Sequence, residues 1–358
     1  MAAAHRFIGL SLCGGSCGDD GAGSIRHKCL LRFGSDDVLL RMNRHCYAVH
    51  GLTIASSFRV HSWGAASIAD GSIPVEQSVP WLVLKTARGQ QTSPPHGASA
   101  PTRRGGLAVS RGALGLCLRT VTGDLAWLSD CSKRHDQPQI ASLQRAAGVS
   151  RVQFERVLCN VLLPNVLATQ GHRMLHAAAV IVAGKAVLFC GDSGAGKSTL
   201  AAGFSTLGFD VLSDDVLRLA RGSDGHWSAF PSYPGLHLRP ETFLEVPAGA
   251  AARRGKQWVP LSVNHKLREG VPVAAMYGLA RQLRVAPSIS PMGGVSALEQ
   301  WMRALFMDGV PRERRAPEAF DAALSLARHV PTFGLRYRRS PQHFGDLLKS
   351  IIDHAERL

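Results

Sequence analysis

The feature that most constrains this chain is a glycine-rich octapeptide, GDSGAGKS, at residues 191–198. An apolar, β-type run at 186–190 leads directly into it, and a helix-forming segment opens at Ser198. The octapeptide fits the pattern Gly-x-x-x-x-Gly-Lys-Ser/Thr of loops that bind nucleotide phosphates between a strand and a helix. A glycine-rich structural turn is the alternative, and the flanking strand and helix disfavour it.

Each fixed position of this loop has a chemical reason. The glycines let the backbone turn with its N–H groups inward, which makes a concave anion site without Cβ obstruction. Lys197 would reach the β- and γ-phosphates, the Ser198 hydroxyl would coordinate magnesium, and the helix dipole would favour the phosphates. The predicted nucleotide-binding residues are Gly191, Asp192, Ser193, Gly194, Ala195, Gly196, Lys197, Ser198 and Thr199. We therefore predict ATP and Mg²⁺ as cofactors.

The segments around the loop predict its neighbours. Two β-type runs at 176–182 and 186–190 flank a short Ala-Gly-Lys turn, which is typical of a β-hairpin. The helix after the loop is expected to end at Leu207-Gly208. Residues 209–212 would then return as a short strand parallel to 186–190 in a right-handed βαβ crossover. Its carboxyl end would lie beside the loop, where ligands bind in such sheets.

Two adjacent carboxylates, Asp214 and Asp215, follow that strand. One can hold the metal, directly or through water, and the other can accept the proton of an attacking hydroxyl. A solvated turn or a helix cap is the alternative. His176 opens the hairpin and would reach the mouth of the same site, or it is an ordinary structural histidine. The predicted catalytic residues are Asp214, Asp215, Lys197 and His176, and the predicted metal ligands are Ser198 and Asp214.

The rest of the chain predicts a smaller unit ahead of this core. Residues 1–42 are rich in Gly and Asp and lack periodicity, so we expect a disordered tail, with Met42 as an alternative start. Short β-type pieces over 43–135, with a Pro/Gly/Ser-rich loop at 87–106, predict a β-rich N-terminal domain. A helical pattern that opens near Gln139, recurs over 154–167, is broken by Pro164 and ends near Gly171 belongs to a second domain, 136–358.

Composition narrows the partners. The chain has 41 Lys+Arg against 26 Asp+Glu, a formal net charge of +15. Such an excess would suit nucleic acid or an acidic substrate. The basic residues are dispersed, so we expect a solvated basic surface and no nucleic-acid partner, with an acidic peptide or polyphosphate as the alternative.

Membrane and redox signals are weak in this sequence. No apolar run reaches roughly eighteen residues, so we expect no membrane span. Eight cysteines are scattered without a zinc-type pair of pairs, and Cys13 and Cys17 form a lone CxxxC. Cys159 and Cys190 lie in apolar runs and are expected to be buried. Reduced cysteines fit a cytoplasmic location.

The motifs together resemble a known family. The hairpin, the histidine that opens it, GDSGAGKS, and Asp-Asp on the very next strand look like the catalytic domain of bacterial HPr kinase/phosphorylase, over about residues 172–245. PSYPGLHLRPETF, KQWVPL and the early HCYAVHGLTIAS look like HPr-kinase-related proteins found beside peptide-modification genes, including kinases that phosphorylate a serine of lasso peptides. The resemblance implies that 191–198 bind the triphosphate, that Asp214 and Asp215 share the metal and general-base roles, and that His176 lies near the transferred phosphate.

Two features differ from that family. Its bifunctional members carry a glutamate directly after the loop serine, where this chain has Thr199, and their downstream glycine-rich signature has no clear match here. HPr itself as the substrate and the reverse phosphorylase reaction are therefore not implied. Arg239 and Lys256 are candidate stabilisers of transition-state charge, with an ordinary surface charge as the default.

We therefore predict an α/β fold: a P-loop-type kinase core with a hairpin before the phosphate loop, preceded by a small β-rich N-terminal domain. The expected function is that of an HPr-kinase-like serine kinase, which transfers the γ-phosphoryl group of ATP to a hydroxyl of a small protein or peptide. A nucleotide-binding regulatory or assembly module with little turnover and a small-molecule kinase are the alternatives. The identity of the acceptor and the formation of a homo-oligomer are left open.

Overall fold

A computed structural model of the chain describes a defined set of residues. They are 45–66, 82–86, 102–104, 107–112, 115–121, 123–129, 139–233, 235–238, 257–261, 270–281, 286–307, 310 and 312–358. All of them belong to one compact unit, Arg44–Leu358. The predicted tail at 1–42, the CxxxC pair and the candidate cations Arg239 and Lys256 lie outside the described residues.

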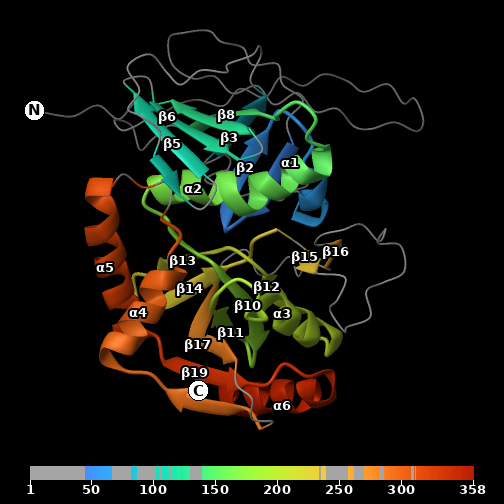
Figure 1. The fold of residues 1–358 in the computed structure, drawn as a ribbon, viewed down its shortest axis with the longest axis vertical. Coiled ribbons are helices and arrows are strands. Elements are labelled where there is room, and N and C mark those ends of the chain that lie inside the picture. Colours follow the sequence, from blue (N-terminus) through green and yellow to red (C-terminus); the bar gives the residue numbers. More distant parts are fainter. Residues whose placement is uncertain are drawn as a thin grey trace, which may run out of the picture. The chain divides into compact units, whose positions relative to one another are not determined.

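The first sheet has eight strands in the order β1-β2-β3-β8-β7-β6-β5-β4 (Figure 1). They are β1 (His45–Val49), β2 (Leu52–Ser56), β3 (Leu82–Thr86), β4 (Thr102–Arg104), β5 (Leu107–Gly112), β6 (Gly115–Thr120), β7 (Leu125–Ser129) and β8 (Gln139–Gln144), with a short 3₁₀ helix, η1 (His61–Ala66), after β2. The helix predicted to open near Gln139 is wrong, because this segment is β8. Ala141 and Leu143 are buried while Ser142 between them is less so, the period of a strand. The first sheet thus extends past residue 135 to β8. The domain boundary between residues 135 and 136 stays a prediction.

A helical segment follows the first sheet. It consists of α1 (Arg151–Val157), a π-helical turn η3 (Leu158–Leu162) and α2 (Leu163–Thr169). The predicted break at Pro164 is wrong, because the helical segment continues through this proline to Thr169. The π-helical turn ends just before Pro164. The Leu163 N–H donates to the Leu158 carbonyl. Pro164 follows in the first turn of α2, where the missing N–H of a proline costs no helical hydrogen bond. The segment ends before Gly171, as predicted, and Gly171 has a φ of 88°.

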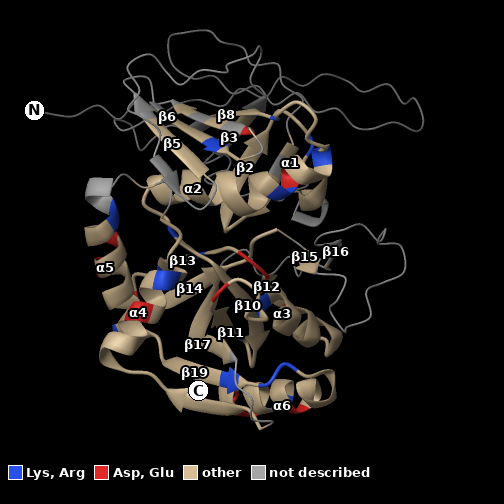
Figure 2. Cartoon of the chain, viewed as in Figure 1, with Lys and Arg blue, Asp and Glu red and all other residues tan. Residues whose placement is uncertain are grey.

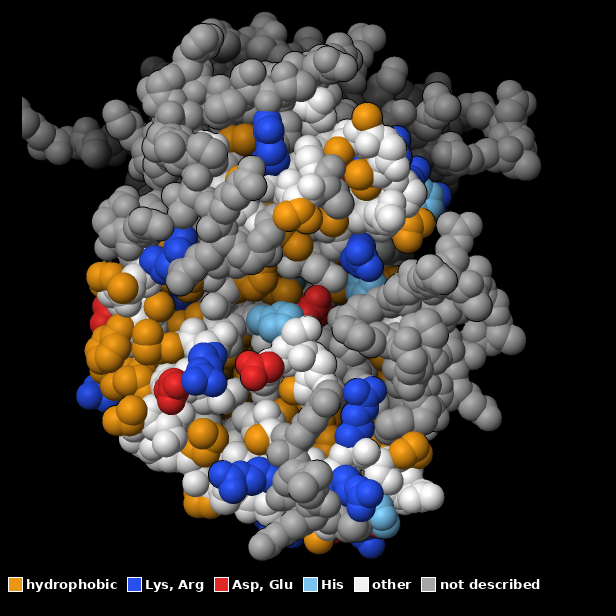
Figure 3. All heavy atoms as spheres, in the orientation of Figure 1, with side chains coloured by type: hydrophobic (Ala, Val, Ile, Leu, Met, Phe, Trp, Pro, Cys, Tyr) orange, Lys and Arg blue, Asp and Glu red, His pale blue; other side chains and the backbone are white. Residues whose placement is uncertain are grey.

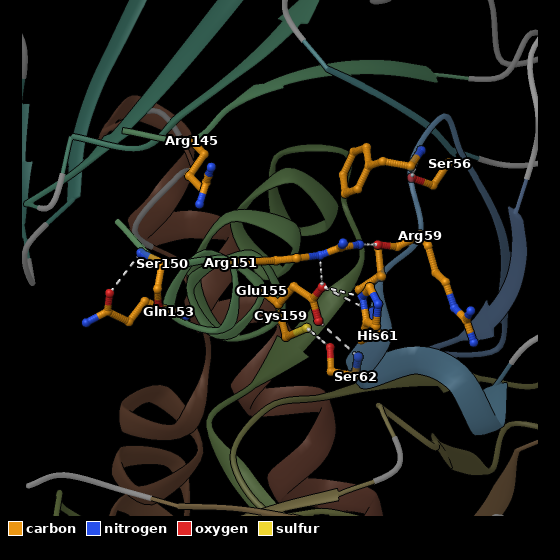
Figure 4. A network of polar contacts seen from close by, with 12 residues as sticks. Ser56, Arg59, His61, Ser62, Arg145, Ser150, Arg151, Gln153, Glu155 and Cys159 are labelled. Carbon is orange, nitrogen blue, oxygen red and sulfur yellow. Dashed lines mark hydrogen bonds and ion pairs between the residues drawn. The ribbon is translucent and has the colours of Figure 1, made fainter. Parts of the chain in front are cut away.

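Glu155 ties this helical segment to the chain after β2 (Figure 4). Its carboxylate accepts hydrogen bonds from the backbone N–H groups of His61 (3.1 Å) and Ser62 (3.0 Å) and from Arg151 Nε (3.0 Å). Burial alone would raise the pKa of Glu155, but these hydrogen bonds together bring the pKa below its ordinary value. One helical turn further on, Cys159 is buried against Trp63, and burial raises the pKa of its thiol to about 12. Cys159 is therefore a packing residue, as predicted.

The second sheet has nine strands and mixes parallel with antiparallel pairs. Its order is β12-β10-β11-β17-β14-β13-β9, and β19 pairs with both β17 and β18. The strands are β9 (Arg173–Leu175), β10 (Ala177–Val182), β11 (Lys185–Cys190), β12 (Val211–Ser213), β13 (Leu217–Arg221), β14 (Trp227–Phe230), β17 (Val271–Arg281), β18 (Ser288–Pro291) and β19 (Thr332–Tyr337). A separate pair, β15 (Gly235–Leu238) and β16 (Gln257–Pro260), completes the strands. The fold is therefore mixed α/β.

Helices pack against both faces of the second sheet. They are α3 (Lys197–Thr206), α4 (Gly294–Ala304), α5 (Arg312–His329) and α6 (Phe344–Ala355), with a 3₁₀ turn, η5 (Pro341–His343), before α6. Alternate residues of β11 separate into two buried clusters: Leu188 packs with Trp301 of α4, while Phe189 packs with Phe204 of α3 and Ile351 of α6. This alternation is what a strand buried on both faces requires. It explains why 186–190 is apolar at every position.

The predicted hairpin and helix end are confirmed. Val182 pairs with Lys185 across a two-residue turn, in which Ala183 and Gly184 have φ values of 47° and 76°. Helix α3 ends at Thr206, and Gly208 follows with a φ of 85°.

The neighbour of the strand after α3 differs from the expectation. Strand β12 runs in the same direction as β11, as predicted, but it pairs antiparallel with β10, which lies between the two. The physical reason is that both edges of β11 are already taken, by β10 on one side and by β17 on the other. The returning strand therefore adds to the outer edge of the hairpin.

Charged side chains are spread over many elements. Figure 2 shows Lys and Arg on separate helices and strands rather than along one face of one element. On the face drawn in Figure 3, basic, acidic and histidine side chains are interspersed with apolar ones. The dispersal expected from the sequence is thus seen in the described part of the chain. Within that part, none of the helices combines the length and the apolar character needed to cross a bilayer.

Candidate functional site

One edge of the second sheet collects the predicted site residues. Cys190 at the end of β11 pairs with Ala177 at the start of β10 and with Gly278 near the end of β17. Because β12 runs in the direction of β11, the acids that follow it reach the same edge. The carboxyl ends of parallel strands are where ligands bind in α/β sheets. The sheet therefore brings together segments that lie far apart in the sequence.

The glycine loop, residues 191–196, rises from this edge. Gly191, Gly194 and Gly196 have φ values of 154°, 81° and 115°, which L side chains rarely adopt. A Cβ on Gly196 would lie 2.2 Å from the Tyr337 hydroxyl, and that hydroxyl donates to the Ala195 carbonyl. The loop is thus held by a tyrosine of β19 as well as by its own glycines.

The first residues of α3 close the loop. Lys197 is only 6% exposed, and its Nζ donates to the carbonyls of Gly191 (2.7 Å) and Asp192 (3.3 Å). The Ser198 hydroxyl lies 3.5 Å from the Asp214 carbonyl oxygen, so the start of α3 and the acids are neighbours. Gly196 at the N-cap has no side chain to accept the first N–H groups of α3, and an anion is a common alternative acceptor.

Asp214 lies in a buried polar network and is only 1% exposed. Its Oδ2 accepts the backbone N–H of His237 at 2.6 Å, and its Oδ1 lies 3.4 Å from the Tyr233 hydroxyl. The same hydroxyl lies 2.5 Å from Oδ1 of Asn160, in the π turn, and 3.1 Å from Nδ1 of His237. Burial, followed by the charge of Asp214, raises the pKa of Tyr233 well above its ordinary value. We call Asn160, Asp214, Tyr233 and His237 the Tyr233 network.

The Asp215 carboxylate has a different partner from that of Asp214 and pairs with His176. The distance between Asp215 Oδ1 and His176 Nδ1 is 3.1 Å, and the two side chains are 16% and 39% exposed. The backbone N–H of His176 donates to the backbone carbonyl of Ala304 at 2.7 Å, which fixes the start of the hairpin against the end of α4. Of the two acids, Asp215 is therefore the one more open to a ligand. His176 does reach this acid, while the chemical roles of both residues stay predictions.

The donor atoms at this edge suit magnesium. Ser198 offers a hydroxyl and the two aspartates offer carboxylates, and Mg²⁺ prefers such oxygen ligands. Among the residues that the structure describes, no group of three or more His, Cys, Asp or Glu side chains is placed to hold a metal. A magnesium ion here would therefore take further ligands from phosphate and water, as it commonly does at nucleotide sites.

A cavity of about 720 Å³ adjoins the glycine loop. Its lining includes residues 192–195, Gly278 and Gly334 of the neighbouring strands β17 and β19, and Gln300 and Arg303 of α4. The acids, His176, Lys197 and Ser198 are not part of this lining. The glycine loop thus has the acids on the β10–β12 side and a cavity on the β17–β19 side.

The sequence did not predict this cavity or the contacts of Tyr233, His237 and Tyr337. PSYPGLH carries Tyr233 and His237, and its sequence indicates a family resemblance but no contact with Asp214. No local pattern could reveal contacts to Asp214, which lies about twenty residues away in the chain. Tyr337 reaches the loop through the parallel pairing of β17 and β19, which is also non-local.

Comparisons with known proteins add little. No family model matches the chain, and no curated protein matches it. Among solved structures, it is similar to the HPr(Ser) kinase/phosphatase from Coxiella burnetii, at 13% sequence identity and a TM-score of 0.29, over 51% of this chain and 95% of that one. The family resemblance rests on the sequence motifs.

Proposed function

We propose that the protein is a Mg²⁺- and ATP-dependent kinase that transfers the γ-phosphoryl group to a serine hydroxyl of a small protein or peptide. The observation that carries the proposal is the meeting, at one sheet edge, of the glycine loop, the start of α3 and the Asp215–His176 pair. A phosphate-cradling loop next to a carboxylate that can accept the proton of the attacking hydroxyl is a recurring arrangement in phosphoryl transfer.

In this proposal the glycine loop and Lys197 bind the triphosphate. The positive φ angles of Gly191, Gly194 and Gly196 support this role, because such backbone can turn N–H groups toward an anion. The Lys197 ammonium lies within the loop, against two of its carbonyls, where its charge would meet the phosphate oxygens. Substitution of this lysine is expected to weaken nucleotide binding more than it changes the fold.

Asp215 is the residue that accepts the proton of the attacking hydroxyl. It is the more exposed of the two acids, and His176 holds its carboxylate in one orientation at 3.1 Å. Asp214 and Ser198 would hold magnesium. Each carboxylate oxygen has two lone pairs, so the hydrogen bonds from Tyr233 and His237 leave Asp214 able to bind a cation. Bound Mg²⁺ would neutralise charge on the β- and γ-phosphates.

A second candidate function is a nucleotide-binding regulatory or assembly module with little turnover. The contacts of Asp214 with Tyr233 and His237, and those of Lys197 with loop carbonyls, favour it, because both groups already have protein partners. This candidate predicts nucleotide affinity without ATP hydrolysis or acceptor phosphorylation.

A measurement of ATP turnover distinguishes the kinase from the nucleotide-binding module. The experiment measures transfer of labelled phosphate from γ-labelled ATP to a library of serine-containing peptides, together with ADP release. The kinase proposal predicts transfer by the wild type and a loss of about 10²- to 10⁴-fold in Asp215→Asn, the range expected for a general base. Asp353→Asn, at an exposed aspartate of α6, is the matched control and should keep full activity. ADP release and peptide labelling that are equal in Asp215→Asn and wild type would contradict the proposal.

A further inference from the structure

The Tyr233 hydroxyl lies between the π-helical turn η3 and the acids that follow β12. The residue is only 3% exposed. Its ring packs against those of His237 and Trp258, with centroid distances of 5.7 Å and 5.4 Å. The hydroxyl is thus enclosed, and a buried hydroxyl takes its hydrogen-bond partners from the protein. These partners are Asn160, His237 and Asp214.

A phenol has a single hydrogen to donate, so the acceptors around Tyr233 compete for it. The hydroxyl oxygen lies 2.5 Å from Asn160 Oδ1 and 3.4 Å from Asp214 Oδ1. The first distance falls in the ordinary range of an O–H···O hydrogen bond, and the second lies beyond that range. The Tyr233 hydrogen is therefore directed at Asn160, and the bond from Tyr233 to Asp214 is weak.

His237 sets the direction of the hydrogen bonds in this network. Its Nδ1 lies 3.1 Å from the Tyr233 oxygen, and its backbone N–H donates to Asp214 Oδ2 at 2.6 Å. Because Tyr233 donates to Asn160, the imidazole is the donor to Tyr233 and carries a hydrogen on Nδ1. The side-chain hydrogen bonds then run from His237 to Tyr233 to Asn160. Asp214 is thus anchored through Oδ2, while Oδ1 accepts the weaker of these two bonds.

We infer that Asn160 is a positioning residue for the metal: it accepts the Tyr233 hydrogen and so keeps that hydrogen away from the Asp214 carboxylate, which would hold magnesium. A carboxylate accepts a hydrogen bond more strongly than an amide oxygen does, so without Asn160 the Tyr233 hydroxyl would turn to Asp214. The new bond at Oδ1 would then compete with the cation. Asn160 lies in a π-helical turn, and such turns within α-helices are frequent at functional sites. This inference rests on the proposed function.

The experiment measures the magnesium gain, the ratio of the ATP affinities of the full chain with Mg²⁺ and with a chelator, by titration calorimetry. The wild type should bind ATP more tightly with Mg²⁺. Asn160→Leu removes the acceptor and should lower the magnesium gain about tenfold, because a hydrogen bond to a charged group then opposes the ion. Tyr233→Phe and the double variant lack the hydroxyl and should keep the wild-type gain. Asn165→Leu, at an amide that donates to the Val161 carbonyl in the same helical segment, is the matched control.

Recovery of the magnesium gain in the double variant supports the inference, because the losses from two purely structural substitutions would not cancel. A gain that is unchanged in Asn160→Leu, or that stays low in the double variant, overturns it. A loss of the gain in Tyr233→Phe alone also overturns it, and this result does not depend on the folding of Asn160→Leu. These outcomes leave the proposed function intact, whereas a wild type that binds no ATP, with or without Mg²⁺, overturns the proposed function as well.

Discussion

At the residue scale, the two adjacent acids have separate surroundings although they are neighbours in sequence. Asp214 is enclosed by the Tyr233 network, while Asp215 faces His176 and is more exposed. The sequence predicted shared metal and base roles for the pair. In the proposed function these different surroundings are the reason that Asp214 would hold the metal and Asp215 would take the proton. The π-helical turn η3, between α1 and α2, contributes Asn160 to this arrangement.

The first prediction concerns the Tyr233 hydroxyl. Tyr233→Phe removes a buried group that contacts Asn160, His237 and Asp214, so the unfolding free energy should fall by about 1–3 kcal/mol. Urea denaturation followed by circular dichroism measures it. Tyr277→Phe removes a hydroxyl that contacts His354, which is partly exposed and can bond water instead, so its loss should be smaller. Equal losses in the two variants would contradict the role of the network.

The second prediction concerns pH and Glu155. The pKa of this carboxyl is lower in the folded protein than its ordinary value of 4.5, so its ionised form stabilises the fold. The contribution is fully present above the unfolded pKa and is lost as pH falls through the lower folded pKa. Glu155→Gln should therefore be less stable than wild type at neutral pH, and the difference should shrink below about pH 4. Glu356→Gln, at an exposed glutamate, is the matched control. A Glu155→Gln difference that stays constant from pH 7 to pH 3 would be inconsistent with the pKa direction.

At the element scale, the glycine loop depends on a strand that comes much later in the chain. Tyr337 of β19 donates to Ala195 and occupies the space into which a side chain at position 196 would project. Strand β19 is held in place by its parallel pairing with β17, which in turn pairs with β11. The loop conformation is therefore a property of three neighbouring strands and not of its own sequence alone.

The third prediction compares two glycines that both have positive φ. Gly196→Ala adds a Cβ that meets the Tyr337 hydroxyl, so the loop must shift, and Mg-ATP affinity should fall by at least about tenfold. Gly208→Ala, after α3, meets only open space and should cost about 1 kcal/mol of stability without changing affinity. Calorimetry for binding and thermal unfolding for stability separate the two effects. A Gly196→Ala protein that binds Mg-ATP as wild type does would show that the loop is not the phosphate site.

The elements that the sequence predicted correctly are governed by local rules. The hairpin turn, the glycine after α3 and the end of the linking helix each follow from residues within a few positions. Gln139–Gln144 was mistaken for a helix start because its six residues are too few to separate a period of two from one of 3.6. The sequence does not predict the pairing of β12 with β10, because local sequence does not indicate which edge of the sheet is free to accept a further strand.

At the scale of the whole molecule, the second sheet determines which residues can act together. It brings the start of β10, the end of β11 and the end of β12 to one edge, from segments between His176 and Asp215. The Lys and Arg side chains that carry the net charge of +15 are spread over separate helices and strands in Figure 2. The proposed function is therefore tested at that edge, with substitutions of Lys197, which would contact phosphate, and of Asp215, which would contact the acceptor.

The most direct test of this account is titration calorimetry of the full chain with Mg-ATP, on the wild type, Lys197→Ala and Lys349→Ala. If the glycine loop binds phosphate, the wild type and Lys349→Ala, at an exposed lysine of α6, give measurable heat of binding. The affinity of Lys197→Ala is then at least about tenfold lower, as expected for the loss of a charge-assisted contact to phosphate. No heat with the wild type, or the same affinity in Lys197→Ala as in the other two proteins, would contradict it.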